Sequence, residues 1–401
     1  MGNARWARVS GPLAPYAEGY RIELQRLGYT PSSTEFKVNE MSHLSRWLEG
    51  NGLGVGDVAT ATVVAFLTDW GVGVGRVPTL RAMKPLLEWL FIQGVIGTDP
   101  PPPRRAVDDL MDDYRRWMVT ERALAARTVW RYEATARRFL VGRVKTAEAT
   151  GAKSLTGQAV TAFLLAEASR GLARGSLQGR VAELRSLLRF LHWKGLTDSA
   201  LTESVPPVPG WKDSAVPPRL ATAAVRTLVD SCNRATPTGM RDFAMLLLLS
   251  RLGLRAAEVA RLELDDVDWR AGEFVVRGKA RREDRLPLPT DVGEALSVYL
   301  VQARPRVESR TVFLTVAAPP RPLWPTTVSQ MVWRQCVRAG LPPVRAHRLR
   351  HALATDLLDH GVALPKIAQV LRQRDLATTA GYAKVDYSAL RELALPWPAV
   401  P

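Results

Sequence analysis

Residues 241–262 read RDFAMLLLLSRLGLRAAEVARL, and this stretch decides the fold of the C-terminal part of the chain. Its first part, Arg241–Leu254, predicts a buried helix because apolar residues follow one another with hardly a polar break. The residues after it, AAEVARLELDDVD, predict a short amphipathic helix and a turn. Gly253 permits a tight backbone turn at the junction, since glycine adopts conformations that other residues avoid. We therefore expect two helices joined by a tight turn.

A hairpin is expected after these two helices. Ala271 and Gly272 open the strand EFVVRG, the polar residues KARRED form the tip, and RLPLP returns. This pattern is typical of two antiparallel strands. Further along, TTVSQMVWRQCVRAG and HRLRHALATDLLDHG predict helices, and a final helix is expected near Tyr382. Residues 215–401 are therefore predicted to form an α+β domain, mainly α with a small antiparallel sheet.

Two proline-rich stretches interrupt the chain before this domain. DPPPPRR (Asp99–Arg105) and VPPVPGWKDSAVPPR (Val205–Arg219) are typical of linkers. They place domains at residues 1–100, 105–205 and 215–401, each of an ordinary domain size.

The first two segments resemble each other. The parallel pairs are VATATVVAFL (58–67) with LTGQAVTAFL (155–164), and LLEWLFIQGVI (86–96) with LLRFLHWKGLT (187–197). Helical apolar spacing, with Gly94 and Gly195 at the helix ends, predicts two small helical bundles. A divergent duplication is our preferred interpretation, and chance resemblance between amphipathic helices is the alternative. We expect Trp47, Trp70 and Trp89 in the core of the first bundle.

The composition indicates a polyanionic partner. The 401 residues carry 55 Lys and Arg against 39 Asp and Glu, a formal net charge of +16. Such an excess favours nucleic acid binding, although an arginine-rich genome would also raise it. The two cysteines, Cys232 and Cys336, have no spacing typical of a disulfide framework or a zinc site. With no signal peptide and no apolar run of membrane-spanning length, we expect a soluble protein of the cytoplasm, associated with the nucleoid.

Several basic residues form a candidate phosphate site. Histidine is scarce, five in all, yet His347, His351 and His360 lie close together. In HRLRH, His347 and Arg350 are three residues apart and share a helical face, so a ring nitrogen and a guanidinium can converge on one target. An ordinary surface pair is the alternative. His351 is a supporting candidate.

Arg255 follows the buried helix directly, which suggests a specific anionic partner. Glu258 either holds Arg255 in place or caps the short helix, and the sequence leaves both interpretations open. The planar guanidiniums of Arg255 and Arg350 suit the oxygens of a phosphate whose charge grows in a transition state.

Lys279 lies in the arginine-rich hairpin tip RGKARRED, in a chain that has only nine lysines. Lysine gives up a proton near neutral pH when its pKa is lowered, and arginine does not, so Lys279 is a candidate proton donor to a leaving oxygen. The alternative is a solvated tip that merely touches phosphate. Arg277, Arg281 and Arg282 are candidate DNA contacts.

Tyr382 lies in LRQRDLATTAGYAKVD and is the candidate nucleophile. A tyrosine hydroxyl attacks phosphorus well only if its proton is removed and the developing charge is neutralised. Arginine, lysine and histidine can do both. A phosphotyrosine keeps the energy of the broken phosphodiester, so the strand can be resealed without ATP, metal or another cofactor.

The order of these residues resembles the catalytic set of the tyrosine recombinase (phage integrase) family: Arg255, Lys279, His347, Arg350, position 373 and Tyr382. The resemblance implies that Arg255 and Arg350 clamp the scissile phosphate. It further implies that Lys279 protonates the 5′ oxygen, that His347 assists proton transfer and that Tyr382 forms a 3′ phosphotyrosyl link. It also implies that residues 105–205 form a SAM-like, core-binding bundle and that residues 1–100 form a second bundle of this type, which binds additional DNA or mediates protein contacts. The family further implies a tetramer on double-stranded DNA with a specific recombination site.

Position 373 is where the sequence departs from this family. The family usually has His or Trp there, in a context similar to LGHSSxxTT, whereas this chain reads LRQRDLATT. Gln373 donates a hydrogen bond but cannot become cationic. Two alternatives to a site-specific recombinase of a mobile element stay open. One is a nicking-closing enzyme similar to type IB topoisomerases, and the other is a DNA-binding regulator of the same fold with weakened or lost catalysis.

Overall fold

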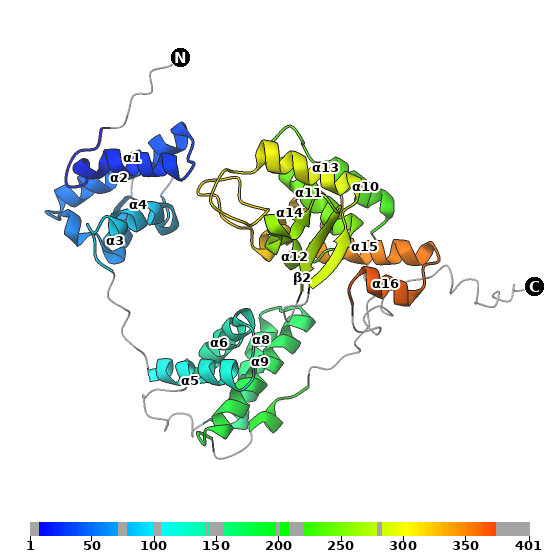
Figure 1. Ribbon diagram of the computed structural model, residues 1–401. Helices are drawn as coiled ribbons and strands as arrows, with labels where there is room; N and C mark the ends of the chain where they lie inside the picture. Colours follow the sequence, from blue (N-terminus) through cyan, green and yellow to red (C-terminus); the bar gives the residue numbers. More distant parts are fainter. Residues whose placement is uncertain are drawn as a thin grey trace, which may run out of the picture. The chain divides into compact units, whose positions relative to one another are not determined.

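The computed structural model consists of helices with one small sheet (Figure 1). It describes residues 8–70, 78–98, 106–141, 143, 155–197, 201–207, 220–278 and 283–373. The chain separates into two compact units, one made of Met1–Asp99 with Val216–Pro401 and the other of Pro100–Ala215. The division into three domains stays a prediction, although buried apolar residues form separate clusters in each of the three segments.

The first segment is a helical bundle. Its elements are η1 (Ala14–Tyr16), α1 (Ala17–Arg26), α2 (Pro31–Gly50), η2 (Val55–Asp57), α3 (Thr60–Trp70) and α4 (Leu80–Ile92). Trp89 is buried in its core, and Trp47 and Trp70 pack against that core from the edge. The core position expected for these tryptophans is confirmed for Trp89, whereas Trp47 and Trp70 are only partly buried.

The second segment is also a helical bundle. Its described elements are α5 (Ala106–Thr120), α6 (Ala126–Leu140), α8 (Gly157–Ser169), α9 (Arg174–Trp193) and η3 (Leu201–Ser204). The ends of α4 and α9 have the same geometry, because Gly94 and Gly195 both adopt a positive φ, 69° and 70°. In each case the next residue donates a backbone hydrogen bond to a carbonyl five residues back, as in a Schellman motif. The two glycines therefore end the helices as expected.

The C-terminal segment contains the sheet. Its elements are α10 (Thr222–Asp230), α11 (Pro237–Arg251), α12 (Ala256–Arg261), η4 (Leu264–Asp266), β1 (Val267–Asp268), β2 (Glu273–Arg277), β3 (Glu283–Pro287), α13 (Thr290–Val298), η6 (Tyr299–Ala303), α14 (Pro325–Arg338), α15 (Ala346–Asp359) and α16 (Leu364–Val370). The final helix expected near Tyr382 lies outside the described residues.

Helix α11 forms the centre of this segment. Thr236 caps its first turn by accepting a hydrogen bond from the Gly239 N–H at 3.1 Å. The leucines of α11 share one core with residues of β2, α13 and α14. The helix ends at Arg251 and not at Leu254 as expected, because Gly253 has a φ of +58° and turns the chain toward α12.

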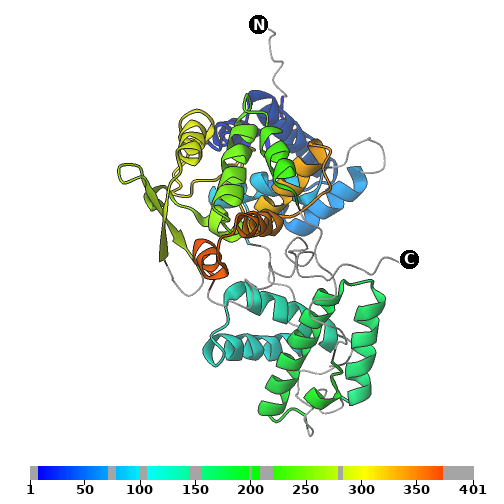
Figure 2. The same cartoon turned by 90° about the vertical axis from the view of Figure 1, so that its right-hand side faces the viewer.

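The expected hairpin is present. β2 pairs with β3 in antiparallel register from Glu273 opposite Pro287 to Arg277 opposite Glu283, and β1 adds a third strand beside β2. The return strand begins at Glu283, earlier than the RLPLP segment, because pairing continues to the end of β2. Figure 2 draws the sheet at one edge of the helices of this segment.

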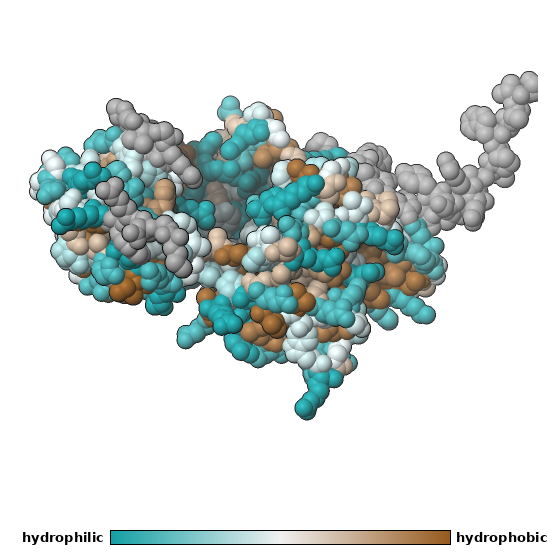
Figure 3. Space-filling model, turned by 90° about the horizontal axis from the view of Figure 1, so that it is seen from above, coloured by the Kyte–Doolittle hydropathy of each residue, from teal (hydrophilic) through white to brown (hydrophobic). Residues whose placement is uncertain are grey.

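The surface mixes polar and apolar residues. On the face drawn in Figure 3, hydrophobic residues are scattered among hydrophilic ones. Within the part of the chain that the structure describes, none of the helices combines the length and the apolar character needed to cross a membrane.

Candidate active site

Arg255 and Glu258 meet at the start of α12. Arg255 is the residue just before the helix, and its backbone N–H donates to Glu258 Oε2 at 2.8 Å. The Arg255 Nη1 donates to the other carboxylate oxygen, Oε1, at 2.6 Å. Glu258 therefore does both things that the sequence left open, because it caps the helix and holds the guanidinium.

Gly253 brings this helix start against the end of α16. A Cβ atom at Gly253 would lie 2.7 Å from Leu371 Cδ2 and 3.0 Å from Leu353 Cδ2, closer than carbon atoms approach. The positive φ of Gly253 adds a second reason for glycine here. The turn before Arg255 can therefore pack directly on the turn that precedes Gln373.

Arg350 connects these two turns. Its Nη1 donates to the carbonyl of Gly253 at 2.5 Å, and its Nη2 donates to the carbonyl of Leu371. Arg350 is only 1% exposed, so its guanidinium acts here as an internal link between segments far apart in the sequence. Contact of Arg350 with a phosphate stays a prediction.

A second guanidinium, which was not expected from the sequence, also binds Glu258. Arg372 Nη2 donates to Glu258 Oε2 at 3.0 Å, and both side chains are almost completely buried. Burial alone would raise the pKa of the Glu258 carboxyl, but the backbone hydrogen bond from Arg255 and the charges of Arg372 and Arg255 lower it below its ordinary value. Glu258 is thus ionised between two arginines.

His347 and His351 contact each other on α15. Their Nε2 atoms lie 2.9 Å apart, one helical turn along, and the ring planes are perpendicular. Burial, then the charges of Arg350 and Arg255, lower the pKa of His347. Burial and the neighbouring His347 lower the pKa of His351 to about 4. Both rings are therefore neutral at pH 7, and one Nε2 donates to the other.

Gln373 lies at the end of α16, directly after Arg372. Its backbone N–H donates to the Ala368 carbonyl at 2.8 Å, which fixes the chain at this point. Arg372 precedes it with a φ of +53°, a value that favours glycine. One feature of the sequence could have pointed to Arg372. The family pattern LGHSSxxTT has glycine at the position that Arg372 occupies in LRQRDLATT.

Arg277, at the end of β2, is surrounded by carboxylates. It forms ion pairs with Asp266 at 2.6 Å, with Glu263 at 3.4 Å and with Glu283 at 3.5 Å. These contacts tie the hairpin to η4, and a DNA contact of Arg277 stays a prediction. The other candidates in the hairpin tip and beyond α16 lie outside the described residues: Lys279, Arg281, Arg282 and Tyr382.

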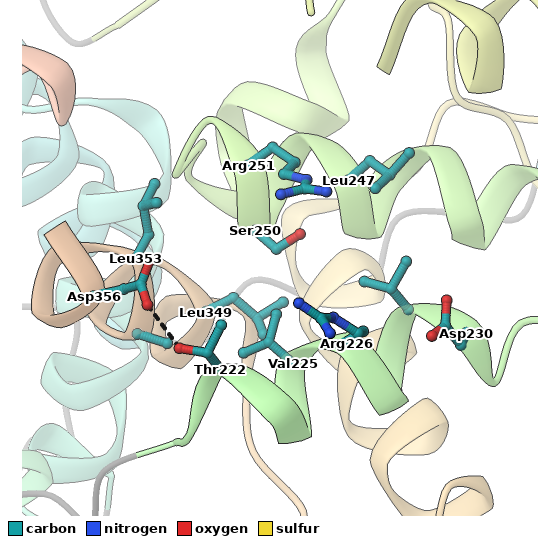
Figure 4. A pocket seen from close by; sticks show the side chains of 12 residues that line it. Thr222, Val225, Arg226, Asp230, Leu247, Ser250, Arg251, Leu349, Leu353 and Asp356 are labelled. Atoms are coloured by element: carbon teal, nitrogen blue, oxygen red, sulfur yellow. Dashed lines mark hydrogen bonds between the residues drawn. The ribbon is translucent and has the colours of Figure 1, made fainter. Parts of the chain in front are cut away.

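A separate pocket of about 280 Å³ lies between α10, α11 and α15 (Figure 4). The Thr222 hydroxyl donates to the Asp356 carboxylate at 2.7 Å across its edge. Arg226 and Arg251 also line it, with Leu349 from the helix that carries the histidines. None of the candidate site residues lines this pocket. Among the described residues, no group of three His, Cys, Asp or Glu side chains could hold a metal ion.

Comparisons with known proteins settle the family. Residues 218–389 match the phage integrase family. Over 394 residues the chain is 39% identical to y4rA of Sinorhizobium fredii, named as an integrase/recombinase, with 97% of this chain and 95% of that protein covered. The chain belongs to the phage integrase family. It is thus a tyrosine recombinase, an enzyme of DNA recombination, and the family match extends over Lys279 and Tyr382.

Two more distant similarities concern this recombinase. It is 27% identical over 292 residues to the tyrosine recombinase XerD of Listeria monocytogenes serovar 1/2a, with 72% of this chain and 97% of that protein covered. Its fold is similar to that of lambda integrase in a tetramer bound to a Holliday junction. The TM-score is 0.54 at 15% identity, with 82% of this chain and 91% of that chain covered. The fold expected from the sequence, mainly helical with a small antiparallel sheet, is confirmed.

Proposed function

We propose that this tyrosine recombinase cleaves and rejoins DNA at a specific site through a covalent phosphotyrosyl bond at Tyr382. One observation carries the proposal. The start of α12 and helix α15 are far apart in sequence, yet contacts and charges link the candidate residues that they carry at one site: Arg255, Glu258, His347 and Arg350. Gln373 is joined to the same site through Arg372, and Tyr382 follows nine residues later within the family match.

The proposed reaction exchanges one phosphoester for another. The Tyr382 oxygen attacks phosphorus and loses its proton, and the bond from phosphorus to the 5′ oxygen breaks. Lys279 gives a proton to the leaving 5′ oxygen, and guanidiniums stabilise the charge on the phosphate. Attack by a 5′ hydroxyl reverses each step and releases Tyr382, so neither ATP nor a metal is consumed.

His347 has the properties of a proton acceptor in this scheme. Its lowered pKa leaves the ring neutral at pH 7, so a ring nitrogen is able to take a proton. The contact with His351 fixes the ring orientation, because one Nε2 must donate and the other accept. Glu258 orients Arg255 toward the same site.

The proposed partners are double-stranded DNA with a specific site and three further copies of the chain. The net charge of +16 supports a DNA partner, and lambda integrase of similar fold is a tetramer on a Holliday junction. In the second bundle, buried Glu183 holds the partly exposed guanidiniums of Arg131 and Arg180 at 2.6 and 2.8 Å. Arginines held in this way lose less side-chain freedom when they contact phosphate.

The test is covalent capture on nicked DNA that flanks the gene. We expect the wild-type protein to become attached to it and Tyr382→Phe not to do so. Tyr387→Phe is the matched control, because it removes a nearby hydroxyl of the same kind. Site-independent relaxation of supercoiled DNA would favour a topoisomerase-like enzyme, and tight binding without any adduct would favour a regulator without catalysis.

A further inference from the structure

Arg372 occupies a backbone position that suits glycine. Helix α16 ends in a Schellman motif, in which the Arg372 N–H donates to the Gln369 carbonyl at 2.9 Å and the Gln373 N–H to the Ala368 carbonyl at 2.8 Å. The residue at this place in the motif has a positive φ, and Arg372 has +53°. A side chain with a Cβ is disfavoured in this conformation. An arginine here therefore needs a compensating contact.

The guanidinium of Arg372 makes that contact inside the site. Only 4% of the side chain is exposed, and its Nη2 binds the buried Glu258 carboxylate at 3.0 Å while its Nη1 lies 3.3 Å from the Val370 carbonyl. The other carboxylate oxygen of Glu258 binds Arg255. Arg372, Glu258 and Arg255 thus form a chain of two cations around one anion.

We propose that Arg372 is a positioning residue for DNA cleavage, which holds the Glu258 carboxylate in place and through it orients the Arg255 guanidinium. The proposal rests on the proposed function, because it assigns Arg372 a part in that reaction. Arg255 and Arg372 together carry two positive charges against one negative charge, so the group keeps a net positive charge for a phosphate.

The charge on Arg372 matters most when a phosphate approaches. Arg255 is 45% exposed and is the outer member of the chain, so it is the guanidinium that a phosphate competes for. Without Arg372, any weakening of the contact between Arg255 and Glu258 leaves a buried carboxylate without a cation, which is costly. With Arg372 in place, Glu258 stays neutralised while Arg255 turns to the phosphate. Arg372 also supplies a positive charge beside Gln373, which cannot carry one.

The experiment compares Arg372→Gly with wild type on the nicked DNA described above. Glycine relaxes the backbone at this φ, so the protein should fold. We expect DNA affinity within about twofold of wild type and a single-turnover rate of adduct formation lower by about 10- to 100-fold, the usual effect of losing a supporting partner. Arg372→Lys, which keeps the charge, should recover part of the rate. Arg310→Ala is the control, because it removes an arginine from an exposed pair of the same segment.

The pH profile distinguishes positioning from simple stabilisation. Removal of the Arg372 charge raises the pKa of Glu258, and Glu258 must be ionised to hold Arg255. As the solution is made more acidic, the rate of adduct formation should therefore begin to fall at a higher pH in Arg372→Gly than in wild type. This fall on the acidic side of the profile is its acid limb. A rate and an acid limb equal to those of wild type would overturn this role alone. Failure of wild-type protein to form any adduct would overturn the proposed function, and this role with it.

Discussion

Arg350 is the residue on which the site geometry depends most. It is buried and binds the carbonyls of Gly253 and Leu371, so one side chain fixes the turns that precede both Arg255 and Gln373. A guanidinium suits this position because its planar fork reaches two acceptors at once. The sequence indicated a cation at Arg350 from the HRLRH pattern. It could not indicate these partners, because they are backbone atoms from distant segments.

His351 makes the stability of the protein depend on pH. Its pKa is lowered to about 4, whereas an unfolded histidine titrates near 6.5. Between these values the unfolded chain binds a proton that the folded chain does not, so the titration of His351 lowers the free energy of unfolding as the pH falls from 6.5 toward 4. We expect His351→Gln to show a weaker loss of unfolding free energy over this range, measured by urea unfolding at a series of pH values.

The outcome that would contradict this prediction is an unchanged acid dependence in His351→Gln. His360→Gln is the matched control, because His360 lies on the exposed end of the same helix. An equal weakening of the acid dependence by both substitutions would show that the effect is not specific to His351.

At the scale of elements, the turn between α11 and α12 is the most constrained connection near the site. Gly253→Ala places a Cβ at a positive φ and 2.7 Å from Leu371 Cδ2. Gly272→Ala has a similar φ of 66° with no atom within 4 Å of the added Cβ, so it measures the backbone cost alone. We expect Gly272→Ala to lower the free energy of unfolding by about 1 kcal/mol and Gly253→Ala by about 2 kcal/mol or more.

Denaturant unfolding of both variants checks this prediction. We also expect slower adduct formation in Gly253→Ala, because the turn positions Arg255 and the Arg350 contact, and no such loss in Gly272→Ala. Equal destabilisation by the two substitutions would show that the packing of Gly253 on Leu371 contributes nothing.

Much of the secondary structure near the site could be predicted from local patterns. The apolar run of α11, Gly253 and the Gly272 turn each have a short-range cause, and the structure has the corresponding helix, turn and hairpin. The ion pair of Arg372 with Glu258 joins residues that are 114 positions apart, so no local pattern could reveal it. The role of Arg277 in the hairpin was missed for the same reason, because Asp266 comes from a different element.

At the scale of the whole molecule, charge governs the encounter with DNA. A protein that neutralises several phosphates releases counterions, so its affinity for DNA falls steeply with salt. We expect the affinity of the full chain for DNA to fall by about 10³-fold or more between 50 and 200 mM salt. Arg131→Gln in the second bundle should reduce the slope of this dependence by about one, as measured by fluorescence anisotropy.

Arg310→Gln is the control for this measurement, since it removes the same charge from an exposed ion pair. An equal reduction of the slope by both substitutions would mean that net charge alone matters. No reduction by Arg131→Gln would mean that this arginine does not contact phosphate.

The sequence predicted the family from the order of the candidate catalytic residues along the chain, and the comparisons confirm the family. It predicted two bundles before a mixed segment from proline-rich stretches and repeated helices, and each segment has its own buried cluster. The catalytic roles of all the candidate site residues stay predictions, and Lys279 and Tyr382 also lie outside the described part of the chain.

The central claim is that Tyr382 forms the covalent bond with DNA, and one measurement tests it directly. Wild-type protein is reacted with nicked DNA that flanks the gene, the adduct is digested with protease, and the peptide attached to DNA is identified by mass spectrometry. We predict that this peptide contains Tyr382, that Tyr387→Phe gives the same adduct and that Tyr382→Phe gives none. An adduct that persists in Tyr382→Phe and is lost in Tyr387→Phe would contradict the account.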